Sequence, residues 1–368
     1  MRNAMNIYKR KDGRFEGRIP FGRDDNGNLK YKYLYSRSLS ELKDKMLNAY
    51  TTSEKYSPIV YSKTLQELSL EWLDSAKLRV KESSYCCYEK IVTKHIIPYF
   101  KQIKYTELNT PKINAFIGYL LKNGKSNGKG GLSVKTVHDI IVAMRSVAKY
   151  AEREYGLRNP MHNISMPKIE KKDVPVLDEN ERKILQNYLM SNLNNTNIGI
   201  LLTMYSGMRI GEIGALKWRD IDLKSGIIHI SRTIQRIKDK SGKSKTKLVI
   251  GTPKSKTSER TIPDFLVDIL KARNCNENSF ILSGTYNPTE PRTIQNRFKS
   301  VLKKCGIRNV NFHLLRHTYA TVCIENGFDA KTVSELLGHA SVNITLNRYV
   351  HSSLDMKKKY VAKLNFAA

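Results

Sequence analysis

The hydrophobic periodicity changes twice along the 368-residue chain, and these changes limit the folds that it can adopt. Before about residue 36, apolar and polar residues alternate in short runs separated by glycine-containing turns, as in a small antiparallel sheet. Ser38 and Glu41 then have the spacing of a capping box, which predicts a helix through about Ala49. Residues 1–57 are therefore expected to form a three-stranded sheet with one helix.

Between residues 62 and 168 the apolar residues recur with a helical period, which predicts a helical bundle. The stretch 123–131 is rich in glycine and is expected to be a loop. Polar segments around Pro58 and over 167–175 are the predicted linkers on either side. The residues expected on the buried helix faces are Leu65, Leu68, Trp72 and Leu73, then Ile113, Phe116, Ile117, Leu120 and Leu121, then Ile140, Ile141, Met144, Val147 and Ala148.

The last segment, 174–368, combines both periodicities. It begins helical and then shows strand-like runs over 227–237 and 247–250. Three more helices are expected over 294–305, 314–326 and 331–337. The fold class is therefore multidomain and mainly α, with an α+β domain at the C-terminal end.

The charge of the chain indicates its partner. Lys and Arg number 64 and Asp and Glu 34, which leaves a formal net charge of +30. Such an excess repels itself in a compact protein, so a polyanionic partner is the natural explanation. Nucleic acid is favoured over a membrane surface because the basic residues are spread through folded segments and are not confined to a tail.

The five cysteines show neither a CxxC pair nor the Cys/His spacing of a metal site. Their odd number and the lack of a signal peptide favour a reducing cytoplasm, and a bacterial, DNA-associated protein is expected. No apolar run reaches the roughly 18 residues that a membrane-spanning helix needs.

Four short stretches carry most of the chemical information: 205–214, 253–258, 313–317, and 336–339 followed by Tyr349. Each of them alone has a structural explanation. An arginine could pair with a glutamate one helical turn away, and Tyr349 is one of 20 tyrosines. Together they supply two arginines, a lysine in a turn, two histidines and a late tyrosine, which is the set needed to attack a phosphodiester without a metal.

The residue types suit that reaction. Planar guanidinium groups donate two hydrogen bonds to the oxygens on which charge develops in the transition state. A leaving 5′-oxygen must be protonated by a positioned lysine or histidine. A tyrosine with an ordinary pKa near ~10 needs neighbouring positive charge and a base before it can act as a nucleophile.

The motifs SGMRIGEI, HLLRHTYAT and ELLGHASVNITLNRYVH resemble those of the tyrosine recombinase (phage integrase) family. The arrangement is most similar to the integrases of conjugative transposons and temperate phages. The catalytic resemblance covers about residues 176–360, while the first 170 residues match by pattern and charge. It implies an arm-type DNA-binding domain (1–57), a helical, SAM-like core-DNA-binding domain (62–168) and a catalytic tyrosine recombinase domain (174–368).

The resemblance also implies a role for each matched residue. Arg209 and Arg316 would grip the scissile phosphate, and Tyr349 would form the 3′-phosphotyrosyl link. Lys256, on the turn of a β-hairpin, would be the general acid, and His313 would assist proton transfer at the nucleophile. His339 would bind a phosphate oxygen, and Glu212 would orient Arg209. Lys254 lies in the same turn as Lys256 and stays open as the alternative lysine. His317 is expected to be structural.

The implied reaction conserves the phosphodiester energy in a protein–DNA bond, so neither ATP nor a metal or other cofactor is expected. The expected partners are double-stranded DNA attachment sites, of core and arm type, three further copies of the chain in a homotetramer, and an excisionase. No membrane partner is expected. Contacts to the DNA backbone should supply most of the affinity.

Three other functions are alternatives to an integrase that integrates and excises a mobile element. A type IB topoisomerase shares the tyrosine chemistry but does not exchange partners, and the N-terminal basic sheet argues against it. A chromosome-dimer resolvase or invertase would use the same site but usually lacks that sheet. A non-catalytic DNA-binding regulator does not fit an intact set of six residues.

The chain after Tyr349 predicts one more element. Ser352 and Ser353 resemble a helix N-cap, and Met356, Tyr360, Val361 and Leu364 follow at helical spacing. An amphipathic tail helix of this kind could close its own domain or dock on a neighbouring protomer.

Overall fold

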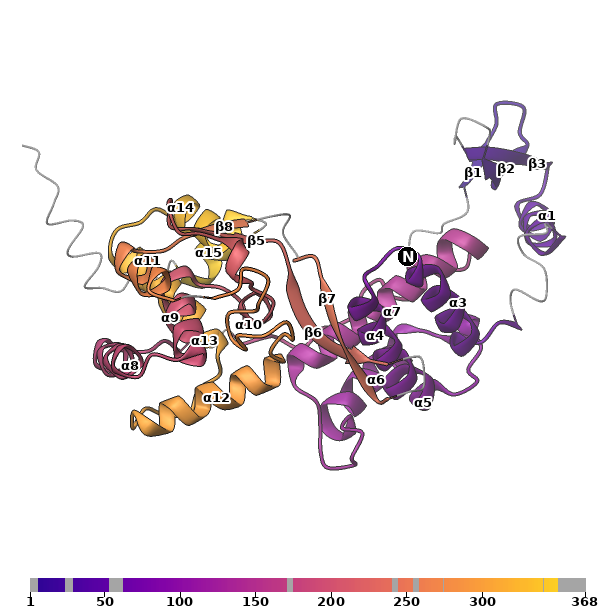
Figure 1. Ribbon diagram of the computed structural model, residues 1–368. Coiled ribbons are helices and arrows are strands. Elements are labelled where there is room, and N and C mark those ends of the chain that lie inside the picture. Colours follow the sequence, from indigo (N-terminus) through magenta and orange to yellow (C-terminus); the bar gives the residue numbers. More distant parts are fainter. Residues whose placement is uncertain are drawn as a thin grey trace, which may run out of the picture. The chain divides into compact units, whose positions relative to one another are not determined.

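The computed structural model describes residues 6–23, 29–52, 62–170, 175–239, 244–253, 258–273, 275–339 and 341–349. The chain divides into two compact units, residues 1–170 and 171–368, and each is described by itself (Figure 1). The linker predicted around Pro58, most of the lysine-containing turn and the tail after Tyr349 lie outside the described residues. The structure confirms the fold class, which is mainly helical with a small N-terminal sheet and an α+β second unit.

The N-terminal part of the first unit contains the predicted three-stranded sheet. Strands β1 (Asn6–Lys9), β2 (Phe15–Arg23) and β3 (Leu29–Ser36) are antiparallel in the order β1-β2-β3. Helix α1 (Leu39–Thr52) packs on the sheet through Leu42 and Met46, which are buried with Ile19. Arg18 pairs with Tyr33 across β2 and β3, so the face turned away from α1 carries aromatic and basic residues.

The rest of the first unit is a helical bundle. Its main helices begin at side chains that accept a backbone N–H: Thr64 before α3 (Leu65–Lys77), Asn109 before α6 (Thr110–Asn123) and Ser133 before α7 (Val134–Tyr155). Between α3 and α6 the chain forms α4 (Glu82–Ile91), a π-helical turn (Val92–Ile96) and α5 (Ile97–Phe100), which periodicity did not predict. The apolar faces predicted above form the core of this bundle.

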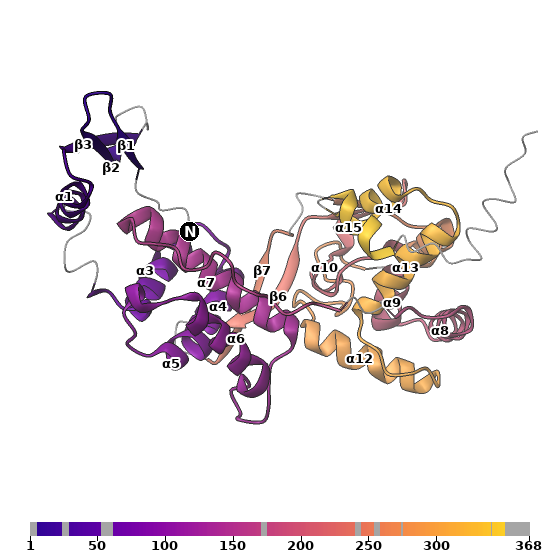
Figure 2. The ribbon, with the colours of Figure 1, turned by 180° about the vertical axis from the view of Figure 1, so that it is seen from behind.

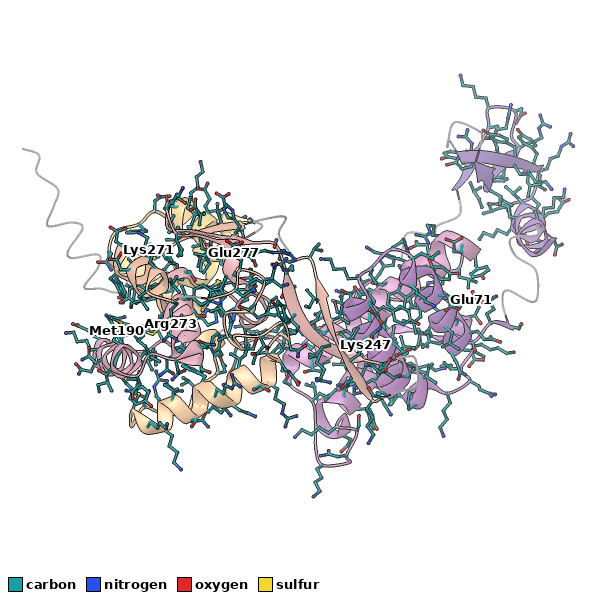
Figure 3. All side chains as sticks on the ribbon, in the orientation of Figure 1. Glu71, Met190, Lys247, Lys271, Arg273 and Glu277 are labelled. Carbon is teal, nitrogen blue, oxygen red and sulfur yellow. The ribbon has the colours of Figure 1, made fainter. Side chains whose placement is uncertain are left out.

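A polar contact joins the two ends of the bundle sequence. The hydroxyl of Tyr155, at the end of α7, donates to Glu71 Oε2 on α3 at 2.6 Å. Lys63, just before α3, pairs with the other oxygen of the same carboxylate. Figure 3 labels Glu71 on this part of the bundle. The contact fixes the register of the first helix against the last.

The second unit combines helices with two small sheets (Figure 2). The strands form a three-stranded sheet in the order β4-β5-β8 and a separate β6–β7 hairpin. The run 227–237, predicted as one strand-like segment, is divided at residues 231–232. The strands are β4 (Ile221–Asp222), β5 (Ile227–Ile230), β6 (Thr233–Lys238), β7 (Thr246–Gly251) and β8 (Ser258–Thr261).

The helices of the second unit carry the motif residues at their ends. The core is formed by α9, the buried strands and α12, where Phe298 and Phe312 meet edge to face with ring centroids 5.3 Å apart. The helices are α8 (Glu179–Ser191), α9 (Asn195–Ser206), α10 (Ile210–Gly214), α11 (Asp264–Lys271), α12 (Pro291–Lys304), α13 (His313–Glu325), α14 (Ala330–Leu337) and α15 (Val342–Tyr349).

The five cysteines are free thiols, and Cys323 is the buried one. Among the described residues, no helix combines the length and apolar character that crossing a membrane requires.

Candidate active site

The first motif lies where one helix ends and the next begins. Helix α9 is closed by Gly207, whose φ of +63° is the left-handed conformation that glycine adopts readily. A Cβ at this position would lie 2.7 Å from atoms of Leu337 and of Tyr319, so the turn also needs the missing side chain. Arg209 follows two residues later, directly before α10.

Glu212 contacts Arg209 through both oxygens of its carboxylate. One carboxylate oxygen accepts from the Arg209 backbone N–H at 2.8 Å, and the other from Arg209 Nη1 at 2.7 Å. The Glu212 side chain is 2% exposed, whereas that of Arg209 is 30% exposed. A buried carboxylate thus fixes a guanidinium group that still reaches the surface, which suits an arginine that binds an external anion.

Arg316, on α13, is held by backbone carbonyls. Its Nη1 donates to Gly207 O and its Nη2 to Leu337 O, both at 2.8 Å, and the residue is 1% exposed. These two acceptors end α9 and α14, so Arg316 ties together the turn that leads to Arg209 and the turn that leads to His339.

The histidines of the third motif lie at the start of α13. His313 is exposed and His317 is buried, and their rings meet edge to face with centroids 4.5 Å apart. His317 therefore packs against His313, and its structural role stays a prediction. His313 is the histidine of this pair that faces solvent.

His339 follows the left-handed cap Gly338 at the end of α14. Its Nδ1 lies 2.9 Å from Oγ1 of Thr345, a fully buried residue of α15. Tyr349 is the last residue of α15, one helical turn beyond Thr345, and its side chain lies outside the described residues. The hydrogen bond fixes His339 to the helix that ends at the expected nucleophile.

The lysine position differs from the prediction in one respect. Lys254 and Lys256 lie outside the described residues, in the connection between β7 and β8. β7 pairs with β6, and β8 pairs with β5 in another sheet, so this connection is not the turn of a hairpin. The family motif led to the expectation of a hairpin turn, but the β6–β7 pair closes through the preceding connection, residues 239–245.

Four of the predicted residues are thus connected, partly by contacts and partly by the chain. Glu212 contacts Arg209 directly. Arg316 donates to the carbonyls of Gly207 and Leu337, which precede Arg209 and His339 by two residues each. Two residues that the sequence analysis missed belong to the same network, Thr345 and Arg260. Arg260 is 1% exposed and donates from Nη2 to Leu337 O at 2.8 Å. Thr345 stands inside a quoted motif, one turn before Tyr349, and that spacing was a usable signal.

No group of three or more His, Cys, Asp or Glu side chains suited to a metal ion lies within the described parts of the chain. The charged groups that meet around the Gly207 and Leu337 carbonyls are guanidinium groups with one carboxylate. This excess of positive over negative groups favours an anionic ligand.

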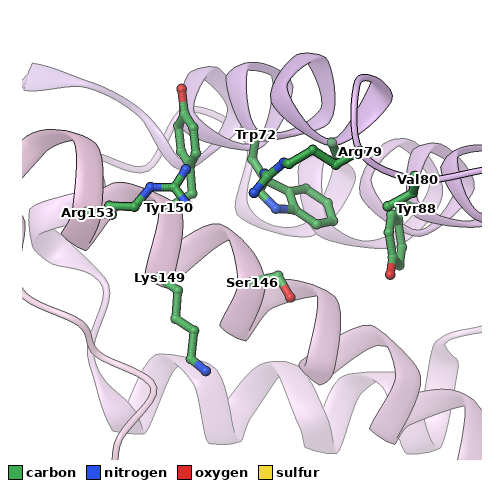
Figure 4. A pocket seen from close by; sticks show the side chains of 9 residues that line it. Trp72, Arg79, Val80, Tyr88, Ser146, Lys149, Tyr150 and Arg153 are labelled. Carbon is green, nitrogen blue, oxygen red and sulfur yellow. The ribbon is translucent and has the colours of Figure 1, made fainter.

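The bundle of the first unit carries a separate basic pocket between α3, α4 and α7 (Figure 4). Its volume is about 310 Å³. Arg79, Lys149 and Arg153 line it together with the aromatic side chains of Trp72, Tyr88 and Tyr150, and its lining, all of it described, includes no carboxylate. Cations beside aromatic rings are suited to a phosphate-bearing partner.

Comparison with known proteins identifies the family. Residues 175–355 match the Phage integrase family, and residues 64–121 match the Phage integrase, N-terminal SAM-like domain. A tyrosine recombinase XerC-like protein of Caldanaerobacter subterraneus is 28% identical over 99% of both chains. The ICEBs1 integrase of Bacillus subtilis is 22% identical over 98% of this chain and 99% of its own length.

Two further matches agree. The tyrosine recombinase XerC of Bacillus licheniformis is 30% identical over 62% of this chain and 74% of its own length. The fold is similar to that of the Tn1549 transposon integrase, solved in complex with transposon right end DNA, with a TM-score of 0.66 and 16% identity over 81% of this chain and 98% of that one. The chain therefore belongs to the phage integrase family of tyrosine recombinases, site-specific enzymes that break and rejoin DNA strands.

Proposed function

We propose that this recombinase integrates and excises a mobile element, and that Tyr349 attacks the scissile phosphate within the network around Arg316. The observation that carries the proposal is the pair of backbone carbonyls, Gly207 O and Leu337 O, that Arg316 joins at 2.8 Å each. This pair brings the Arg209 turn and the His339 turn to one guanidinium group. The similarity to the Tn1549 transposon integrase and the ICEBs1 integrase supports a mobile element as the substrate.

Each residue then has a chemical task. Arg209, oriented by Glu212, and Arg316 stabilise the charge that develops on the non-bridging phosphate oxygens. A lysine of the β7–β8 connection, Lys256 by the motif, protonates the leaving 5′-oxygen. His313 assists proton transfer at the nucleophile.

His339 binds a phosphate oxygen, and Thr345 sets the tautomer of its ring. If the Thr345 hydroxyl donates to Nδ1 across the 2.9 Å contact, the proton of the neutral imidazole resides on Nε2. An Nε2–H is the donor that a phosphate oxygen needs. Thr345 therefore prepares His339 and anchors α15 with the same hydrogen bond.

The first unit supplies DNA affinity in this proposal. The pocket lined by Arg79, Lys149 and Arg153 contacts the phosphate backbone of the core site. The sheet face turned away from α1 binds a second, arm-type site. On that face Tyr8, Tyr33 and Tyr35 are 40–48% exposed, and the Arg18 guanidinium lies 4.7 Å from the Tyr8 ring centroid.

Recombination joins two duplexes, so the proposed active form is a homotetramer on DNA, with the tail after Tyr349 joining neighbouring protomers. An excisionase is the expected partner for the reverse reaction. A resolvase or invertase acting through the same site is the second candidate, because the relative that covers 99% of this chain is named for a XerC-like recombinase.

The nucleophile is tested with a nicked suicide substrate, on which cleavage traps the protein covalently. Tyr349→Phe removes only the phenolic oxygen, so DNA binding should persist while the 3′-phosphotyrosyl adduct is lost. Tyr286→Phe is the matched control, because Tyr286 is 67% exposed in the same unit and lies outside the network. An adduct formed by the Tyr349→Phe variant would overturn the assignment.

The element type and the arm site need a second experiment. Protein lacking residues 1–55 should still cleave a short core duplex but assemble poorly on long DNA that carries the ends of the element. Coinciding footprints of full-length and truncated protein on that DNA would refute a second site. Recombination between element ends and an unlinked target, and not only between directly repeated sites, distinguishes an integrase from a resolvase.

A further inference from the structure

Arg260 is a buried arginine that the proposed reaction has not used. It lies on β8 and is 1% exposed. Its Nη1 donates to Glu259 O at 2.9 Å and its Nη2 to Leu337 O at 2.8 Å. Its Nε is buried and has no hydrogen-bond partner in the described structure. A buried charge without full hydrogen bonding is costly, so the site needs a reason to keep it.

The Leu337 carbonyl accepts from two guanidinium groups at once. Arg316 Nη2 and Arg260 Nη2 both lie 2.8 Å from this oxygen. A carbonyl oxygen has two lone pairs, so the two arginines together use its whole accepting capacity. The two positively charged guanidinium groups therefore meet at the Leu337 carbonyl. Because Arg260 occupies one side of this oxygen, it limits the positions that the Arg316 side chain can take.

The same contact supports the turn that carries His339. Gly338, between Leu337 and His339, has a φ of +59°. A Cβ on Gly338 would lie 2.7 Å from Arg260 Nη2 and 3.0 Å from Ser258 Cβ. Arg260 therefore fills the space directly under this turn, and strand β8 packs against α14.

The charge balance around these residues is positive. The buried side chains of the second unit that are ordinarily charged, within the described residues, are Glu212, Arg260 and Arg316. Glu212 is already paired with Arg209 at 2.7 Å. Burial lowers the pKa of Arg260, nearby Glu212 raises it and Arg209 lowers it again, so these groups lie within each other's field. The negative charge of a bound phosphodiester would compensate the excess positive charge of these arginines.

We propose that Arg260 is a positioning residue for strand cleavage: by sharing the Leu337 carbonyl with Arg316, it presets Arg316 and the His339 turn for the scissile phosphate. This inference rests on the proposed function. Arg260 makes no contact with DNA in this proposal. It affects the rate of cleavage through Arg316 and His339, and not through the lysine that protonates the leaving oxygen.

Arg260→Met tests the proposal, because methionine has a similar length, no charge and no donor. Leu337 O keeps its bond from Arg316, so the unfolding temperature should stay within about 3 °C of the wild type or rise. DNA affinity should be unchanged, whereas single-turnover cleavage of the suicide substrate at saturating protein should slow at least about tenfold. Arg260→Lys, which restores the charge without the planar fork, should recover part of the rate.

A substrate with sulfur in place of the bridging 5′-oxygen distinguishes an effect of Arg260 through Arg316 and His339 from an effect through the lysine. A thiolate leaves without a proton donor, so this substrate bypasses the lysine. The Arg260→Met variant should stay slow on it, and restoration of the wild-type rate would overturn the proposed route through Arg316. If the Arg260→Met variant is less stable but each folded molecule cleaves at the wild-type rate, Arg260 has a purely structural role. That result would also overturn the proposal.

If Arg260→Met does not fold, Arg260→Gln takes its place, since its amide has one donor nitrogen and no charge. It should show the same slow cleavage with both substrates, and a wild-type rate would overturn the proposal. The wild type and Tyr349→Phe are run alongside. An adduct in the Tyr349→Phe variant would reject the proposed function itself, whereas a normal Tyr349 adduct with unaffected Arg260 variants rejects this inference alone.

Discussion

The imidazole of His339 and the hydroxyl of Thr345 lie 2.9 Å apart, and this hydrogen bond joins the turn after α14 to the helix that ends at Tyr349. Thr345 is fully buried, so its hydroxyl is shielded from solvent. The two elements that carry a proposed phosphate ligand and the proposed nucleophile are thereby fixed to each other.

Thr345→Val should slow cleavage about fivefold to tenfold, because it removes a hydrogen bond worth about 1–1.5 kcal/mol and frees the His339 ring. Thr345→Ser keeps the hydroxyl and should retain most of the rate. Single-turnover cleavage of the suicide substrate measures both variants. Equal rates for the valine variant and the wild type would show that the contact does not orient His339.

Glu212→Gln should lower both stability and cleavage. The amide cannot accept from both the Arg209 N–H and its Nη1, so one hydrogen bond to a charged group is lost, at a cost of about 1.5–3 kcal/mol. Urea unfolding and the single-turnover rate are the measurements, and the rate should fall at least about tenfold as Arg209 loses its orientation. Glu259→Gln is the control, since that carboxylate is 67% exposed. If both variants behave alike, Glu212 does not hold the catalytic arginine.

The general acid can be assigned by comparing the two lysines of the β7–β8 connection. Lys256→Ala should cleave an ordinary substrate at least about 100-fold more slowly, and a bridging 5′-sulfur should restore most of the rate. Lys254→Ala should be close to the wild type with both substrates. Rescue by sulfur confined to the Lys254 variant would exchange the two roles.

The first unit should lose stability in mild acid because of His95. Burial, and then the charge of Lys90, lower the pKa of this half-buried histidine below its ordinary value. The unfolded chain then binds a proton near pH 6.5 more readily than the folded chain, so the contribution is present above about 6.5 and lost as the pH falls below it. His95→Gln should flatten this dependence.

The measurement is urea unfolding of the full chain at pH 7.5 and 5.5, followed by Trp72 fluorescence in a Trp218→Phe background. Trp72 belongs to the core of the bundle, and Trp218 to that of the second unit. His162→Gln, at an exposed position of the same unit, should leave the pH dependence as it is. A His95 variant with an unchanged slope would contradict the prediction.

The parts of the fold that sequence predicted best are those in which local pattern and burial coincide. The faces of α3, α6 and α7 follow a helical period with capping residues at their starts. Strand β8 was missed because its sequence, SERT, is entirely polar, and its burial depends on pairing with β5. The division between β5 and β6 was missed because strand-like runs lie on both sides and only Ser231 and Arg232 separate them.

The site shows the same distinction. Glu212 lies one turn from Arg209, so local spacing was enough to predict that the two residues pair. Arg260 resembles an ordinary surface arginine in sequence, and its place under the site depends on Leu337, which follows 77 residues later. The spacing of Thr345, one turn before Tyr349, was a local signal, but its contact with His339 depends on where α15 packs.

The acceptors that hold Arg316 are main-chain atoms, Gly207 O and Leu337 O. No side-chain exchange at either position can delete them, so a search for a residue that covaries with Arg316 should return nothing there. What evolution must preserve is the length of the chain between helix end and motif. A one-residue insertion or deletion at either turn would move a carbonyl away, and the constraint on this site should therefore appear in alignments as an absence of gaps.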